Sequence, residues 1–199
     1  GRSEEVILYP LSINEVSSSR PEAEAHLRTM LDRGGYPAMW QLSALEAHAR
    51  LSAIANNYVY RDAFGPQVMY DQTVINDLLR LLAYQIGQEV SYGELAGKLS
   101  VAKETVMRYI DLLEKAFIVL RRNQRVEVGR LRKVYFTDLG IRNAVIENFK
   151  PLTTRHGTGA LWENFCVIER LKFLQAHKRR VRSYYWRNPE QREIDIVEE

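Results

Sequence analysis

A short stretch between residues 121 and 133 concentrates positive charge. It contains one acid, Glu127, and six basic residues: Arg121, Arg122, Arg125, Arg130, Arg132 and Lys133. Guanidinium and ammonium groups bind the backbone phosphates of nucleic acids whatever the base sequence. A second basic cluster consists of Lys172, Lys178, Arg179, Arg180 and Arg182. If the protein binds phosphates, we therefore expect the contacts in the last two thirds of the chain.

The segments around the basic stretch have helix and strand patterns. From Thr73 to Ile86, apolar residues recur at spacings of three and four, which predicts a helix with one buried face. Ser91 and Glu94 match a capping box for a short second helix, and 103–115 has the pattern of a third. Strand-forming residues at 117–120 and 133–136 flank the basic stretch. Three helices followed by a basic hairpin predict a winged helix.

In a winged helix that binds DNA, the third helix enters the major groove. This places Lys103 and Arg108 against base edges, and Arg121, Arg122 and Arg125 on backbone phosphates. Three acids on the same helix, Glu104, Asp111 and Glu114, oppose this reading because they repel phosphates. A winged helix that is purely structural or binds protein therefore remains open.

The rest of the chain divides into helical and mixed segments. Helices are expected at 20–33, ended by Gly34 and Gly35, and at 42–62, 138–149 and 161–175. A short buried strand is expected at 6–8, stopped by Pro10, and a hairpin at 181–186 and 193–197. The predicted class is α+β and mainly helical: a winged helix-turn-helix followed by a truncated α/β domain.

The bulk composition excludes several classes of protein. The 199 residues are 46% apolar and 27% charged, which is typical of a globular chain with room for one sizeable core or several small ones. No apolar run is long enough to span a bilayer, and the first residues lack a secretory signal pattern. The single Cys166 fits a reducing compartment, and we expect it to be a buried thiol in a cytoplasmic protein without a membrane partner.

Seven short motifs, taken together and in order, resemble one large group of prokaryotic ATP-binding proteins. They are YPLS at 9–12, GGYP at 34–37, YRD at 60–62, the segment 91–117, YFTD at 135–138, GALWEN at 159–164, and YYWR at 184–187 with EID at 193–195. In this group an AAA+-like ATPase core precedes a helical connector, a winged helix and a C-terminal domain. The segment 155–158 departs from the group because it lacks an acid.

The resemblance implies a division of the chain into four parts. Residues 1–15 would end an ATPase core, 16–69 would form the helical connector, 70–137 the winged helix and 138–199 a truncated nuclease-like domain. ATP and Mg²⁺ are then cofactors of an intact protein, in which Arg2 could face the nucleotide. The chain has no Gly-rich loop followed by Lys-Ser or Lys-Thr, so we expect neither bound nucleotide nor ATP hydrolysis here.

Glu163 and Asp195 resemble the first two acids of the PD-(D/E)xK nuclease superfamily. Their hard oxygen atoms would suit Mg²⁺, which activates water and stabilises a leaving phosphate oxygen. The next acids, Glu198 and Glu199, follow Asp195 too closely to complete that site, and no lysine follows them. In the alternative, Glu163 caps or pairs near the start of its helix, and Asp195 pairs with Arg187 or Arg192.

Two functions follow as hypotheses. The first is a DNA-associated regulatory module of an ATPase, which binds duplex DNA through its winged helix and carries a restriction-endonuclease-like domain. The second is a protein-interaction or assembly module with a degenerate nuclease fold, whose partner is another protein or a second copy.

Overall fold

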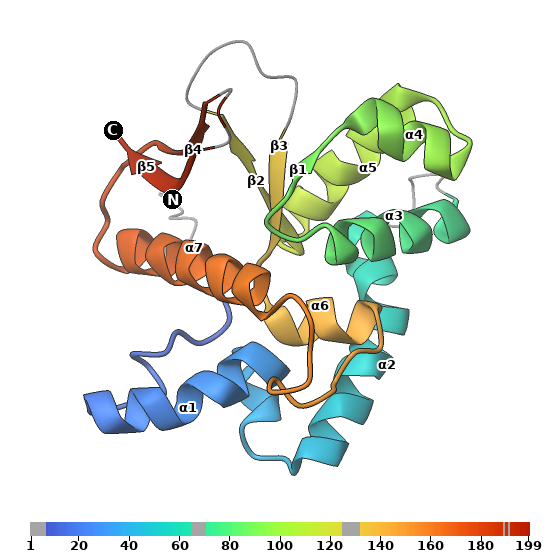
Figure 1. The fold of residues 1–199 in the computed structure, drawn as a ribbon. Helices are drawn as coiled ribbons and strands as arrows, with labels where there is room; N and C mark the ends of the chain where they lie inside the picture. Colours follow the sequence, from blue (N-terminus) through green and yellow to red (C-terminus); the bar gives the residue numbers. More distant parts are fainter. Residues whose placement is uncertain (1–6, 65–70, 125–131, 189, 191) are drawn as a thin grey trace, which may run out of the picture.

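The fold combines helices with two small antiparallel sheets (Figure 1). The computed structural model describes residues 7–64, 71–124, 132–188, 190 and 192–199, with the backbone alone for 57–64. The helices are α1 (Arg20–Arg33), α2 (Ala44–Phe64), α3 (Gln72–Tyr84), α4 (Tyr92–Leu99), α5 (Lys103–Lys115), α6 (Leu139–Val145) and α7 (Thr158–Ala176), with a 3-10 turn at Pro37–Met39. The strands are β1 (Glu89–Val90), β2 (Val119–Asn123), β3 (Arg132–Phe136), β4 (Ser183–Arg187) and β5 (Glu193–Glu198).

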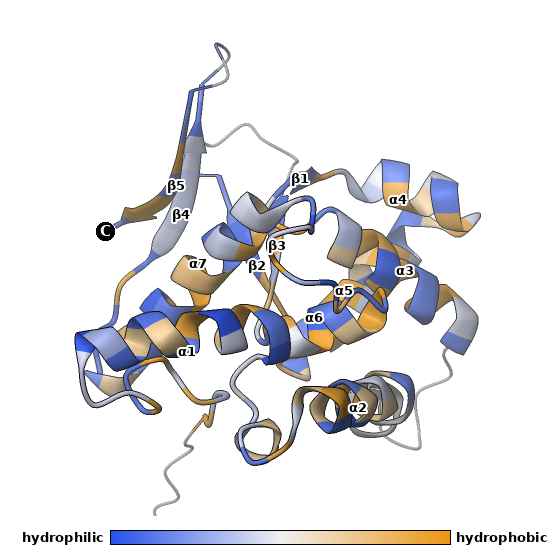
Figure 2. Cartoon of the chain, turned by 60° about the horizontal axis from the view of Figure 1, so that its bottom comes forward, coloured by the Kyte–Doolittle hydropathy of each residue, from blue (hydrophilic) through white to orange (hydrophobic). Residues whose placement is uncertain are grey.

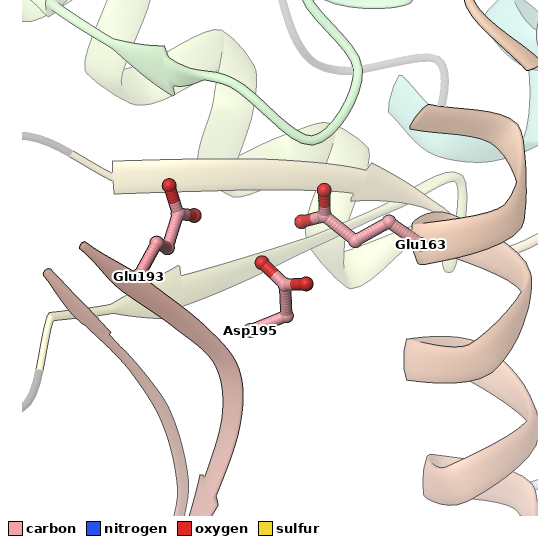
Figure 3. A group of neighbouring side chains, drawn as sticks. All are labelled: Glu163, Glu193 and Asp195. Atoms are coloured by element: carbon pink, nitrogen blue, oxygen red, sulfur yellow. The ribbon is translucent and has the colours of Figure 1, made fainter. Parts of the chain in front are cut away.

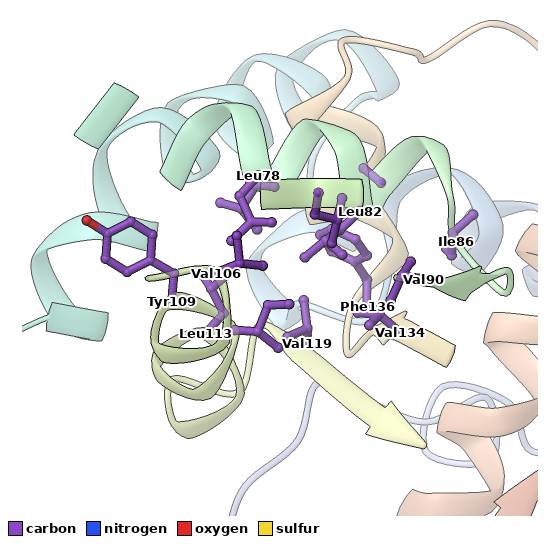
Figure 4. Packing of buried hydrophobic residues seen from close by; sticks show 14 of the residues in the cluster. Leu78, Leu82, Ile86, Val90, Val106, Tyr109, Leu113, Val119, Val134 and Phe136 are labelled. Atoms are coloured by element: carbon purple, nitrogen blue, oxygen red, sulfur yellow. The ribbon is translucent and has the colours of Figure 1, made fainter. Parts of the chain in front are cut away.

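The main hydrophobic core lies between α3, α4, α5 and a sheet of order β1-β3-β2 (Figure 4). Leu78 and Leu82 of α3 meet Val106 and Leu113 of α5, and all four side chains are buried. Each spacing of four or seven places both residues on one helix face, which explains why the periodicity predicted these helices. In the sheet, β3 pairs with β2 and β1 on its two sides.

The start of each core helix follows from a local side chain. Asp71 accepts hydrogen bonds from the Thr73 and Val74 amides, and Ser91 accepts one from the Glu94 amide. These bonds satisfy donors that lack a partner inside the helix. The predicted ranges 20–33 and 103–115 are confirmed as α1 and α5.

A second core joins the 3-10 turn, α2 and α6. It contains Met39, Ala47, Leu51, Ala55, Ile141 and Ala144. Its anchor is the buried Asp138, which caps α6 through the Ile141 amide at 3.0 Å and also accepts the Gly35 amide at 2.7 Å. Gly34 has φ of +71°, and a Cβ there would lie 2.1 Å from the Asp138 carboxylate. The GGYP and YFTD motifs are therefore in direct contact, through Gly34 and Gly35 of the first and Asp138 of the second.

Helix α7 fastens the last segment to the rest of the molecule. The buried Asn164 accepts the Phe136 amide and donates to the Phe136 carbonyl, both at 2.8 Å, so α7 is bound to the end of β3. Val167 and Ile168 of α7 pack on Tyr135, with Leu120 and Ile196 beside them. The β4–β5 hairpin lies next to β2, joined by a bridge between Gln124 and Tyr185. Figure 2 shows hydrophilic colouring on the strand ends that lead to the turn of this hairpin.

Two sequence predictions need correction, and one strand was missed. A buried strand at 6–8 is wrong for its described residues, because 7 and 8 form no strand and Leu8 is 88% exposed. Helix α6 ends at Val145 rather than at 149, since Glu147 takes a positive φ. Strand β1 was not predicted, because two residues leave no period to detect. Within the described ranges, no helix has the length and apolarity needed to cross a membrane.

Candidate functional site

Three carboxylates meet between α7 and the β4–β5 hairpin (Figure 3). Glu163 comes from the second turn of α7, while Glu193 and Asp195 come from β5. Residues two apart on a strand face the same side, so β5 directs both of its acids toward α7. One oxygen of each carboxylate lies within 4.8 Å of the others.

The ammonium group of Lys133 lies among these carboxylates. Its Nζ is 2.8 Å from Glu163 Oε1 and 3.1 Å from Asp195 Oδ1, and it also pairs with Glu193. Lys133 belongs to β3 and is only 2% exposed. A lysine ammonium has three donors and no acceptor, so one donor is available for each carboxylate.

Further polar groups hold the acids in place. Tyr135, two residues after Lys133 on β3, donates its hydroxyl to Glu163 Oε1 at 2.7 Å. Arg122, paired with Lys133 in the sheet, donates to the Asp195 carbonyl at 3.2 Å. Gly87 has a positive φ, and a Cβ at this position would lie 3.0 Å from Glu163 Oε2.

Arg187 adds a second cation to the edge of the cluster. Its Nη1 lies 3.1 Å from Glu89 Oε2, and its Nε lies 3.8 Å from Glu193 Oε2. Glu193 is therefore shared between Lys133 and Arg187. The alternative pairing of Asp195 with Arg187 or Arg192 is not the one observed; Asp195 pairs with Lys133.

The protonation of the cluster follows from burial and charge. Burial acts to lower the pKa of Lys133, but hydrogen bonds to Glu163 and Glu193 outweigh it, and the pKa lies above its usual value. Burial and the neighbouring Glu163 carboxylate raise the pKa of Tyr135. Lys133 is thus charged and Tyr135 neutral at physiological pH, and both act as hydrogen-bond donors to Glu163.

The predicted Mg²⁺ site can be tested against this geometry. Three converging carboxylates supply the oxygen ligands that Mg²⁺ prefers. However, Lys133 Nζ already bonds to all three, and its positive charge repels another cation at the same point. The arrangement therefore does not fit a metal ion while Lys133 stays in place, and we derive no metal-dependent step from it.

The basic residues expected on DNA phosphates lie in several environments. Arg121 forms an ion pair with Asp111 at 2.6 Å and another with Glu114, both on α5. Arg122 is only 4% exposed, and Lys133 is held in the carboxylate cluster. In this arrangement these three cations are engaged inside the molecule. The pairing also offsets part of the negative charge of two acids that were expected to repel phosphates.

Other predicted contact residues are exposed or lie outside the described residues. Lys103 and Arg108 are exposed on α5, and the Arg108 guanidinium lies 5.2 Å from the centre of the Tyr109 ring. Arg132 is half-buried in β3. Arg125 and Arg130, like Arg2, lie outside the described residues. Cys166 is half-buried, and burial raises the pKa of its thiol.

Sequence reasoning brought Glu163 and Asp195 together but missed Glu193 and Lys133. The alternation of Glu193 with Asp195 on one strand face was visible in the sequence. The alternation of Lys133 with Tyr135 was equally visible, yet their contact with α7 depends on how α7 crosses β3. Because the basic stretch was interpreted as a phosphate-binding surface, the buried position of Lys133 was not predicted.

Comparison with known proteins gives two family matches. Residues 24–152 match the domain of unknown function DUF8612, and residues 158–199 match the domain of unknown function DUF4143. The junction between the matches falls later than the predicted boundary at 137/138. Lys133 therefore belongs to the first match, and the three carboxylates belong to the second.

Relatives occur in several bacteria. An uncharacterized protein of Mycobacterium tuberculosis and one of Mycobacterium bovis are each 30% identical over the whole chain, which covers 45% of their length. An uncharacterized protein of Haemophilus influenzae is 24% identical over 90% of the chain and 46% of its own length. The chain thus spans about half the length of these relatives. No solved structure matches the chain.

Proposed function

The chain belongs to the family defined by the domain of unknown function DUF8612, and we propose that it is a regulatory module of an AAA+-like ATPase that does not cut DNA. In this proposal α3, α4, α5 and the β2–β3 hairpin form a winged helix. The segment 158–199 is a degenerate nuclease-like unit fixed to it. The order of motifs along the chain supports the ATPase association, and the greater length of the relatives leaves room for an ATPase core.

A single observation carries the non-cutting part of the proposal: the Lys133 ammonium contacts all three carboxylates of the cluster. Metal-dependent nucleases use such carboxylates to hold a cation that activates water. Here the cation is a side chain, which has no open coordination position for water. The cluster therefore joins the two matched regions instead of performing hydrolysis.

We expect no cleavage of plasmid or linear duplex DNA by this chain in millimolar Mg²⁺ or Mn²⁺. Product formation is followed on gels over hours, with an unrelated metal-dependent endonuclease as positive control. The Asp195→Asn variant serves as the matched control, because any trace activity common to both proteins comes from contamination. Metal-dependent cleavage that disappears in Asp195→Asn contradicts the proposal.

DNA association is a second candidate, favoured by the exposed cations of α5. Lys103, Met107 and Arg108 are exposed on α5, and Arg121 pairs with Asp111 and Glu114, which offsets part of their negative charge. Glu104 is also exposed on α5, and it forms no ion pair within the described part of the chain. The exposed part of α5 offers few phosphate contacts, and binding through it is expected to be weak and sensitive to salt.

A further inference from the structure

A basic groove that none of the three cluster carboxylates lines lies between β2 and the chain that follows α7. Its volume is about 850 Å³, far more than a single phosphate needs. Its lining includes Arg121 and Arg122 of β2, and Arg179, Arg180 and Arg182 of the chain after α7. Glu199 is the single acid among the described residues that line it.

The backbone fixes the three arginines after α7 at the rim of this groove. Lys178 takes a positive φ, and the Arg179 amide donates to the Leu174 carbonyl at 2.8 Å, which turns the chain sharply at the helix end. Arg182 and Glu199 then exchange two backbone hydrogen bonds, of 2.9 and 3.0 Å. The direction of the chain at the rim is therefore set by hydrogen bonds on both sides of it.

The side chains at the rim carry charge that no ion pair within the described residues neutralises. Arg179, Arg180 and Arg182 are exposed, and within the described ranges no carboxylate forms an ion pair with any of them. The Arg179 guanidinium lies 5.9 Å from the centre of the Phe173 ring. The C-terminal end of a helix carries only about half a negative charge, so three arginines exceed what α7 needs.

We propose that this groove binds the phosphates of a nucleic acid strand. Arginine is the residue that binds phosphate through two parallel hydrogen bonds, and its planar guanidinium also stacks on bases. The volume of the groove is large enough for more than one phosphate, and its lining includes the apolar residues Leu171 and Leu174. The proposal rests on the second candidate function, DNA association. It places the phosphate contacts in this groove instead of on the exposed side chains of α5.

The test is fluorescence anisotropy of a labelled oligonucleotide, single-stranded and as a duplex, across a salt series. The charge-reversal pair R180E/R182E is expected to weaken binding at least tenfold at low salt. If two contacts are lost, the slope of log affinity against log salt should become shallower by about 1.4 for the single strand. The matched control R50E/K150E changes the net charge equally at exposed positions away from the groove, and should stay within twofold of the wild type.

Two further arms separate this proposal from its alternatives. If K103E/R108E abolishes binding and R180E/R182E leaves it unchanged, DNA association stands and the groove proposal falls. If the wild type does not bind the oligonucleotide at low salt, both fall. If a poly-glutamate peptide of equal charge competes as well as DNA does, the groove recognises an acidic protein segment and the nucleic acid proposal is overturned.

Discussion

Replacing Lys133 with methionine is expected to lower the free energy of unfolding by about 2–4 kcal/mol. Loss of one partner from a buried ion pair typically costs ~3–5 kcal/mol, because the remaining charge is left without compensation. Here three carboxylates would be left within 4.8 Å of each other, although Asp195 is half exposed and solvent screens part of the repulsion. Urea denaturation followed by circular dichroism measures the change.

A double substitution distinguishes charge from packing. Adding Glu163→Gln to Lys133→Met removes one carboxylate charge and should recover about 1 kcal/mol or more of the loss. Lys133→Arg keeps the cation and should be milder than Lys133→Met. Equal losses in all three variants contradict the electrostatic account, since they would mean that the shape of the lysine stem is what matters.

The pH dependence of this contribution has a definite sign. The pKa of Lys133 is raised above its ordinary value of 10.5 by its carboxylate partners. A group whose folded pKa is raised contributes stability that is fully present below the unfolded pKa. The contribution of Lys133 to stability is therefore complete at neutral pH, and on the alkaline side it is lost as the pH rises from the ordinary pKa through the raised pKa of the folded state.

Replacing Asp138 with alanine is expected to lower the free energy of unfolding by about 2–4 kcal/mol. The variant removes a helix cap, worth ~1 kcal/mol, and leaves the buried Gly35 amide without its partner, which costs ~1–3 kcal/mol more. It also opens a space beside Gly34 and Gly140, where α1 and α6 approach closely. The same urea titration measures the loss.

Asp71→Ala is the matched control for this prediction. Asp71 caps α3 in the same way, but it is exposed and its carboxylate bonds only to the amides of its own helix. Its loss should be about 1 kcal/mol. If the two variants lose equal stability, the contact between Asp138 and Gly35 contributes nothing, and the joint between α1 and α6 rests on apolar packing alone.

The helices were largely predictable because their signals are local. Periodic apolar residues, Ser91 as a cap and Gly34 as a terminator act within a few residues of one another. Pairing between β3 and β1 could not be read from the sequence, since it depends on a turn at Gly87 that brings distant segments together. The strand expected at 6–8 was wrong for a related reason. An apolar run followed by proline does not reveal whether another part of the fold covers the segment.

The candidate site was predictable to the extent that its acids lie on one helix and one strand. Glu163 and Asp195 were chosen by resemblance, and the structure brings them together with Glu193. The role of Lys133 was not predictable, because basic residues in a hairpin are usually solvated. Only the crossing of α7 over β3, fixed by Asn164, turns Lys133 inward. That crossing is a tertiary feature, and no local pattern encodes it.

The most direct test of the account is a Mn²⁺ titration of the wild type and of Lys133→Met, followed by electron paramagnetic resonance. With Lys133 present, we expect no binding tighter than millimolar. The repulsion between two unit charges about 4 Å apart is about 1 kcal/mol in water and about 4 kcal/mol at an effective dielectric constant of 20. Removal of the Lys133 charge should therefore raise the Mn²⁺ affinity by about tenfold or more. Circular dichroism checks that the variant is folded. Lys133→Arg keeps the positive charge and should show no increase in Mn²⁺ affinity. Adding Asp195→Asn to Lys133→Met should abolish the increase. Tight Mn²⁺ binding by the wild type that requires Asp195 and is unchanged by Lys133→Met would contradict the assignment of Lys133 as the resident cation of the cluster.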